Sequence, residues 1–249
     1  TVIGKNAIFE GNTAGTHGGV IANYDGDVKI GTTATFDSNH ADNGYGGAIF
    51  NNNYLGTSKL AIDDNVSFVN NTAFQGGAII KNGEIQIGKN SLFENNTAVN
   101  SGAIHSSGKL TIGDASKFTN NKSENYAGAI LFQNGDTMTI GNDVEFSGNE
   151  SGTSGDKHSA GAIAIEDQGD TNANVKAILG NNVKFTANKA TNSAGALYMY
   201  ESAGKAELRP CDRKRTGSGK DVRPGAAPGA AEDQHDLPEL QPPHAAHEP

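Results

Sequence analysis

One sequence unit recurs seven times in the first 208 residues, with nearly constant internal spacing. An Ile or Leu stands six residues before a Phe, an Asn stands three residues after that Phe, and a Gly, a small residue and an aliphatic residue close the unit. Residues 112–121 show the first part of this pattern. A repeat of about 25 residues predicts a solenoid, in which each coil buries its apolar side chains only against its neighbours.

The local patterns within the unit are those of strands. Apolar and polar residues alternate, as in Leu110-Thr111-Ile112, which places two apolar side chains on one face of a strand. A second strand is expected through the Phe and a third through the Gly-Ala-Ile segment. Three short strands per unit predict an all-β fold, namely a single-stranded parallel β-helix of about seven coils, and the crossover rule predicts right-handed coiling. The Gly that follows the first strand in most copies, such as Gly113, is expected to give a corner its backbone freedom.

Each fixed position is expected to form a column of like side chains, because successive coils of such a fold lie about 4.8 Å apart. The Ile and Phe columns should form a dry core. The Asn column should form a ladder of side-chain amides at a buried corner, where Asn also tolerates left-handed backbone. The Gly column should permit close approach of backbone. The structural residues expected from the central units are Phe36, Asn39, Gly47, Ile49, Phe68, Asn71, Gly77, Ile79, Phe93, Asn96, Gly102, Ile104, Phe118, Asn121, Gly128 and Ile130.

The spacing of the unit varies at two points only, before the Gly and after the Gly-Ala-Ile segment. The longest insertions are residues 152–160, 50–59 and 164–176. Loops that leave a solenoid often carry its binding function. The candidate partner-contact residues are aromatic residues in or beside such loops: Tyr45, Phe50, Tyr54, Tyr126 and Phe132, with Tyr24 and Phe74 in the same group. The alternative interpretation is that these aromatic residues cap the ends of the core.

Composition argues against several classes of function. The net charge of −9 disfavours nucleic acid and anionic membrane surfaces as partners. Pectate lyases and polygalacturonases share the β-helix scaffold but place Arg, Lys and clustered Asp on one face. Residues 1–208 contain no Arg, and Asp63 and Asp64 have no counterpart in adjacent units. We therefore expect no enzymatic activity and no cofactor, with a polysaccharide-active β-helix enzyme as the alternative.

No metal site or disulfide is expected either. His17, His40, His105 and His158 fall at unrelated positions of the unit, so each is expected to be solvated. Cys211 is the only cysteine, which excludes an intramolecular disulfide.

The paired motifs Gly-Gly-Ala-Ile, at 46–49 and 76–79, and Phe-x-x-Asn, at 93–96 and 118–121, resemble the repeats of the chlamydial polymorphic outer membrane proteins. Members of that family are autotransporters whose β-helical passenger is displayed on the cell surface by a C-terminal β-barrel. The resemblance covers residues 1 to about 205. It implies an adhesin or structural stalk at the bacterial cell surface, in the outer membrane or extracellular. The partner it implies is a host cell-surface or matrix protein or glycan, and membrane contact would come only through a barrel absent from this chain.

Composition changes abruptly near residue 208. All seven Pro, all four Arg and the Cys lie in residues 209–249. These residues cannot bury a core and are expected to be a disordered tail after a repeat domain of residues 1–208. Residues 204–208 resemble 108–112, so an eighth coil is expected to begin there, with Leu208 in the place of Ile112. We interpret the chain as a fragment of a longer passenger and the residues from about 209 onward as an out-of-frame or fused sequence.

Overall fold

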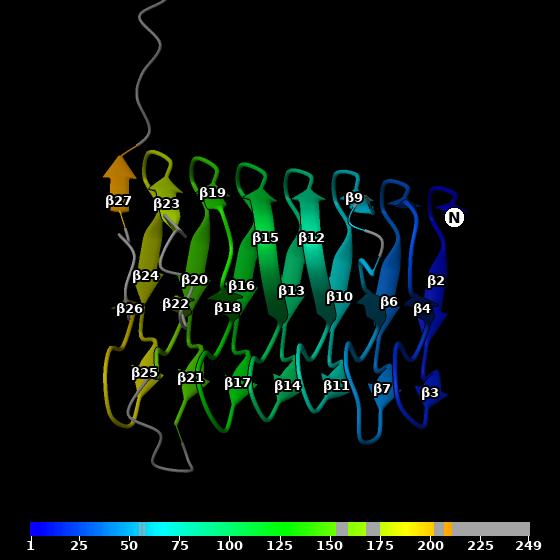
Figure 1. The fold of residues 1–249 in the computed structure, drawn as a ribbon, viewed down its shortest axis with the longest axis horizontal. Coiled ribbons are helices and arrows are strands. Elements are labelled where there is room, and N and C mark those ends of the chain that lie inside the picture. The colour runs from blue at the N-terminus through cyan, green and yellow to red at the C-terminus, as the bar shows by residue number, and fades with distance from the viewer. Residues whose placement is uncertain (55, 57, 153–158, 168–174, 202–206, 211–249) are drawn as a thin grey trace, which may run out of the picture. The chain divides into compact units, whose positions relative to one another are not determined.

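The computed structural model describes residues 1–210 apart from residues 55, 57, 153–158, 168–174 and 202–206. All regular secondary structure in these residues is β-strand, arranged in three parallel sheets that stack coil upon coil (Figure 1). The expected parallel β-helix is therefore confirmed. Of the expected disordered tail, residues 211–249 lie outside the described residues.

Two of the sheets contain one short strand from each of seven coils. The Phe sheet consists of β2 (Ile8–Glu10), β6 (Thr35–Asp37), β10 (Ser67–Val69), β13 (Leu92–Glu94), β16 (Lys117–Thr119), β20 (Glu145–Ser147) and β24 (Lys184–Thr186). The Thr-Ala sheet consists of the two-residue strands β3 (Thr13–Ala14), β7 (His40–Ala41), β11 (Thr72–Ala73), β14 (Thr97–Ala98), β17 (Lys122–Ser123), β21 (Glu150–Ser151) and β25 (Lys189–Ala190).

The third sheet, the Ile sheet, has 13 strands. It holds the column of Ile residues that stand six residues before each Phe and the column of Ile residues in the Gly-Ala-Ile segments. Its strands are β1 (Val2–Ile3), β4 (Ile21–Asn23), β5 (Val28–Ile30), β8 (Ile49–Asn51), β9 (Lys59–Ile62), β12 (Ile79–Ile87), β15 (Ile104–Ile112), β18 (Ile130–Gln133), β19 (Thr137–Ile140), β22 (Ile163–Asp167), β23 (Lys176–Leu179), β26 (Leu197–Glu201) and β27 (Glu207–Pro210).

The division of each coil into strands differs from the expectation. The Gly-Ala-Ile strand and the alternating strand that follows it belong to one sheet, and in two coils they fuse into the nine-residue strands β12 and β15. Gly83 and Gly108 lie inside these strands with φ of 106° and 109°, which only Gly adopts readily. The third strand of each coil is in the Thr-Ala sheet. Its strands are two residues long, which is too short to show an alternation of apolar and polar residues in the sequence.

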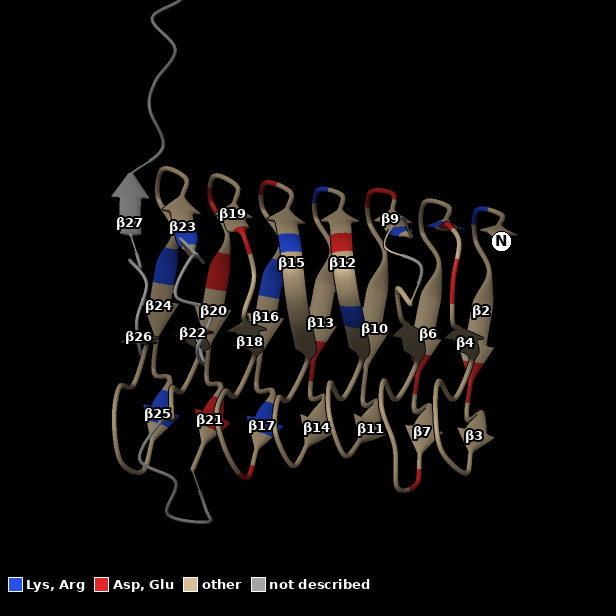
Figure 2. Cartoon of the chain, in the orientation of Figure 1, with Lys and Arg blue, Asp and Glu red and all other residues tan. Residues whose placement is uncertain are grey.

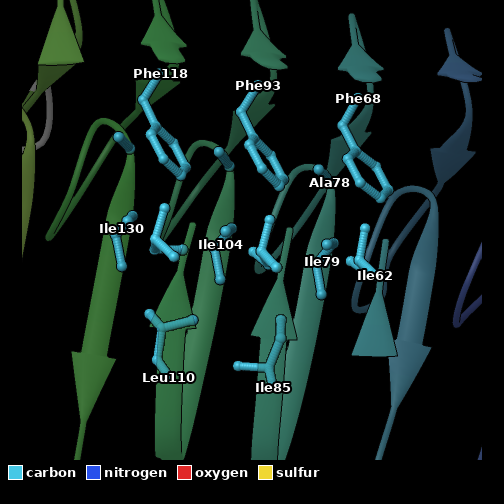
Figure 3. Close-up of a cluster of buried hydrophobic side chains, with 14 of the residues drawn as sticks. Ile62, Phe68, Ala78, Ile79, Ile85, Phe93, Ile104, Leu110, Phe118 and Ile130 are labelled. Atoms are coloured by element: carbon cyan, nitrogen blue, oxygen red, sulfur yellow. The ribbon is translucent and has the colours of Figure 1, made fainter. Parts of the chain in front are cut away.

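The core columns are confirmed. Phe residues pair in register from Phe9 to Phe185, and the ring centroids of Phe93 and Phe118 lie 4.7 Å apart with an interplanar angle of 3°. The predicted core residues Ile30, Phe36, Ile62, Phe68, Ile87, Phe93, Ile112 and Phe118 are all buried. Figure 3 shows the rings of Phe68, Phe93 and Phe118 in one row and Ile79, Ile104 and Ile130 in another, so each coil repeats the same interior contacts.

The Asn column forms the expected amide ladder. Asn71 donates from its backbone N and from Nδ2 to Oδ1 of Asn96, both at 3.0 Å, and Nδ2 also donates to the carbonyl of Phe36 at 2.9 Å. The same pattern connects every Asn of the column from Asn12 to Asn188. Each interior amide therefore satisfies both N–H groups and both lone pairs of its oxygen without water.

Left-handed backbone lies beside the expected positions. The ladder Asn residues do not have positive φ, whereas the residue before them does, as in Asn95 (φ 54°) and Asn120 (φ 55°). At the corner after the Ile strand, Gly113 does not have positive φ, and Ala115 does (φ 56°). The expectation that this Gly supplies conformational freedom is therefore wrong.

Close approach between coils is the reason for Gly at both columns. A Cβ on Gly113 would lie 2.5 Å from the carbonyl carbon of Gly88 in the preceding coil. A Cβ on Gly102, in the Gly-Ala-Ile motif, would lie 2.0 Å from the carbonyl oxygen of Gly128 in the next coil. The expected role of the second Gly column is confirmed, and the first column shares it.

An eighth coil begins, but in a different register. Strand β27 pairs with β23 so that Leu208 is opposite Ala177 and Pro210 is opposite Leu179. The expected alignment placed Leu208 two residues further along, in the column of Ile112. The strand also crosses the expected domain boundary at residue 208, because it includes Arg209 and Pro210.

Candidate binding surface

Three of the five predicted contact residues meet at one surface over the first two coils. His17 is at its centre, with its ring stacked on Phe50 at a centroid distance of 4.5 Å and on Tyr45 at 5.0 Å. Tyr24 packs edge-on against Phe50 at 5.3 Å and is stacked with Tyr54 at 6.2 Å. We call His17, Tyr24, Tyr45, Phe50 and Tyr54 the aromatic cluster.

The aromatic cluster changes from buried to exposed across its width. Phe50 is 5% exposed, whereas Tyr24 is 49% and Tyr54 is 69% exposed. The two tyrosine rings are nearly parallel, with an interplanar angle of 12°. The outer edge of the cluster is therefore an exposed aromatic pair supported by a packed base.

Local sequence explains how the cluster assembles. His17 and Tyr45 each precede a Gly-Gly corner and pair with each other in a parallel bridge. Phe50 follows the core residue Ile49 in β8, so it points to the opposite face of the sheet. Tyr24 and Tyr54 lie in the loops after β4 and β8. Sequence reasoning missed His17, although its place directly before Gly-Gly matches that of Tyr45.

The other predicted contact residues lie elsewhere. Phe132 is fully buried in the main core and pairs in register with Ser106 and Ile165, so it offers no surface to a partner. Tyr126 is half-buried and packs against a second small cluster that contains Leu131. Phe50 is buried and supports the other rings of the aromatic cluster without offering a contact surface itself. The predicted residues that remain available for contact are Tyr45 and Tyr54, with Tyr24 and Phe74 of the same group.

Of the four histidines expected to be solvated, His158 lies outside the described residues, and His105 corrects the expectation. His105 is buried on the outer face of β15, in register between Ile80 and Leu131. Burial lowers its pKa from 6.5 to about 4, and a hydrogen bond with Gln133 acts in the opposite direction. His105 is therefore neutral in the folded protein at neutral pH.

A buried lysine is the second titratable group that sequence reasoning missed. Lys81 is fully buried, and its Nζ donates to Oγ of Ser58 and to the carbonyl of Asn82, each at 2.6 Å. Burial lowers its pKa from 10.5 to about 8, while Asp27 and Asp25 act to raise it. Alignment of the units does contain a signal, because the same inward-facing column holds Phe132 and Ile165 in later coils.

The surface charges of the described residues are distributed along the solenoid. Figure 2 shows acidic and basic residues spread along the coils, and several pair across neighbouring coils, as Lys59 and Glu84 do at 2.9 Å. Asp63 and Asp64 line an open hollow of 240 Å³; Asp63 pairs with Lys29 at 3.7 Å, and Asp64 accepts a hydrogen bond from the backbone of Lys89. In the part of the chain that the structure describes, no three His, Cys, Asp or Glu side chains are grouped to hold a metal ion.

The described residues include no helix long and apolar enough to cross a membrane. Comparisons of the chain with protein-family models, with curated proteins and with solved structures find no match.

Proposed function

We propose that this chain is a non-catalytic adhesion module, displayed on a bacterial surface or secreted in the manner of an autotransporter passenger. Its partner is a host cell-surface or matrix protein or glycan. The observation that carries the proposal is the exposed pair of Tyr24 and Tyr54 on the aromatic cluster. The parallel β-solenoid is compatible with a structural passenger, because its repeated coils hold such a surface on a regular scaffold.

The physical chemistry of the pair suits protein or glycan recognition. Tyrosine is enriched at binding hot spots because its large rigid ring loses little conformational entropy and its hydroxyl can still form hydrogen bonds. Stacking on Phe50 and His17 holds the base of the cluster before any partner arrives. Such preorganisation lowers the entropic cost of binding.

Binding to cultured epithelial cells and to immobilised matrix glycoproteins tests the proposal. Simultaneous Tyr24→Ala and Tyr54→Ala should weaken binding of the purified chain at least about tenfold, the loss of one or more hot-spot residues. Ile8→Ala is the matched control, because Ile8 is a 73% exposed apolar residue on β2, outside the cluster. Equal binding by the double variant and the wild type would rule out the cluster as the contact surface.

The alternative enzymatic function has a separate test. Incubation of the chain with a panel of plant and bacterial polysaccharides should release neither reducing ends nor unsaturated sugars above the level of a heat-denatured control. Turnover on any of them would replace the proposed adhesive function with a polysaccharide lyase or hydrolase.

A further inference from the structure

Next to the aromatic cluster is an open cleft of 510 Å³ that shares Tyr45 with it. The cleft lies over the Thr-Ala sheet, where β7 and β11 supply His40 and Thr72 as register partners. Its volume is within the range of about 300–1,000 Å³ that is usual for small-molecule sites. Of the aromatic residues predicted to contact a partner, Tyr45 and Phe74 line it.

Loop length explains why the surface is hollow here. Five residues separate Ala41 from Gly47, whereas three separate Ala73 from Gly77 and Ala98 from Gly102. The loop after β7 therefore extends beyond the loops after β11 and β14, as Figure 1 shows. The long loop forms one wall, and the shorter neighbouring loops form the floor.

The floor is apolar and aromatic. Phe74 is 43% exposed, a large fraction for an aromatic side chain, and Val99 and Ala73 line the cleft beside it. A ligand that covers the exposed face of Phe74 removes apolar surface from water, which is favourable.

The wall is polar. His40 Nε2 and Asp42 Oδ1 are 2.9 Å apart, and both side chains remain partly exposed. Because a carboxylate has about four lone-pair sites, the contact with His40 leaves Asp42 able to accept hydrogen bonds from a ligand. The amide of Asn43 and the hydroxyl of Thr72 add donors and acceptors along the same cleft.

We propose that this cleft binds a neutral saccharide unit, which rests on and refines the proposed adhesive function. A sugar ring has an apolar face that covers Phe74 and hydroxyl groups that donate to Asp42 and bond to Asn43. Neither Lys nor Arg is among the residues that line the cleft, and the chain carries a net charge of −9, so sulfated, phosphorylated and carboxylated sugars are disfavoured.

The backbone around the cleft disfavours an extended peptide as the ligand. A peptide that adds to a sheet needs an edge with free N–H and C=O groups. Here Thr72 and Ala73 pair with the strands on the adjacent coils, and the N–H groups of Phe74 and Val99 donate to the carbonyls of Gly44 and Phe74.

Ligand-observed NMR with the full chain tests this assignment. The probes are the methyl glycosides of glucose, galactose, mannose and N-acetylglucosamine, with glucuronic acid and sialic acid as anionic comparators, each at about 10 mM, above the millimolar dissociation constants of weak specific binding. At least one neutral glycoside should give saturation transfer. Phe74→Ala and Asp42→Ala should each weaken the affinity for that glycoside at least about tenfold. Phe74→Tyr should retain the affinity, and Tyr54→Ala should leave it unchanged.

The outcomes separate this inference from the proposed function. If no neutral glycoside binds, if the anionic sugars bind as tightly, or if Phe74→Ala has no effect while circular dichroism shows the variant folded, the saccharide assignment is wrong. Adhesion that still depends on Tyr24 and Tyr54 would then leave the proposed function intact. Saccharide binding at the cleft without adhesion to cells or matrix would contradict the proposed function and support the assignment.

Discussion

The Oδ1 atom of Asn121 accepts two hydrogen bonds from Asn96, one from its backbone N at 3.0 Å and one from its Nδ2 at 2.9 Å. Both residues are fully buried, so no water replaces these bonds if one partner is removed. The ladder is therefore a structural element whose loss leaves unsatisfied groups on both sides.

Asn96→Ala should lower the free energy of unfolding by about 3 kcal/mol, because it leaves the backbone N–H and Nδ2 of Asn71 without their acceptor. Urea denaturation followed by circular dichroism measures the change. Asn12→Ala is the matched control at the exposed end of the ladder, and it should cost less than about 1 kcal/mol. Equal costs at the two positions would mean that burial does not determine the strength of the ladder.

Phe93→Ala should cost about 3–5 kcal/mol, since the rings of Phe68 and Phe118 on either side belong to rigid coils and cannot close the cavity. Phe9→Ala should cost less, because Phe9 is only partly buried and stacks on Phe36 alone. Urea denaturation of each variant and of the wild type measures the two losses of stability. A Phe93→Ala cost no greater than that of Phe9→Ala would argue against a rigid stack.

Gly113 and Gly4 occupy the same column, the Gly after the Ile strand, in different coils, and each can be replaced by Ala. In Gly113→Ala the new Cβ would contact the backbone of Gly88 at 2.5 Å, and this overpacking should cost about 1–3 kcal/mol or more. In Gly4→Ala nothing lies within 4 Å of the new Cβ, so stability should change little. Thermal unfolding of the two variants checks the difference. If both were equally destabilised, backbone conformation rather than proximity would explain the Gly column.

The fold followed from sequence because a stack of identical coils requires identical residues at each interior position, and Phe93 and Asn96 repeat for that reason. The contact residues were harder to place. Alternation from Ile130 puts Phe132 on the inner face, which sequence reasoning overlooked. Phe50 points outward, and the rings of His17 and Tyr24 help to bury it. The position of those rings depends on loop paths, which the periodicity of the sequence does not record.

His105 should make the protein less stable in mild acid. Its folded pKa of about 4 is below the ordinary value of 6.5, so the unfolded chain takes up a proton that the folded chain does not. Stability should therefore fall as the pH drops from 6.5 towards 4, by about 3 kcal/mol in all for this group.

The difference in urea midpoint between wild type and His105→Gln, measured from pH 7 to pH 4, isolates this contribution from that of the carboxylates. Parallel curves for wild type and His105→Gln would show that His105 accepts a proton in the folded state.

The Asn ladder also gives the solenoid a direction. Each interior amide donates one N–H to the oxygen of the next coil's amide and points its own oxygen towards the coil before, so the C=O dipoles of the ladder add along the axis instead of cancelling. A stack of this kind is polar in the sense that a filament is polar, and its two faces are chemically unlike. Two arrays joined through their N-terminal coils would bring side-chain amide oxygens of the two ladders together. Only head-to-tail addition therefore continues the ladder. Tandem duplication of the unit preserves that orientation automatically, which makes the array easy to lengthen by whole repeats.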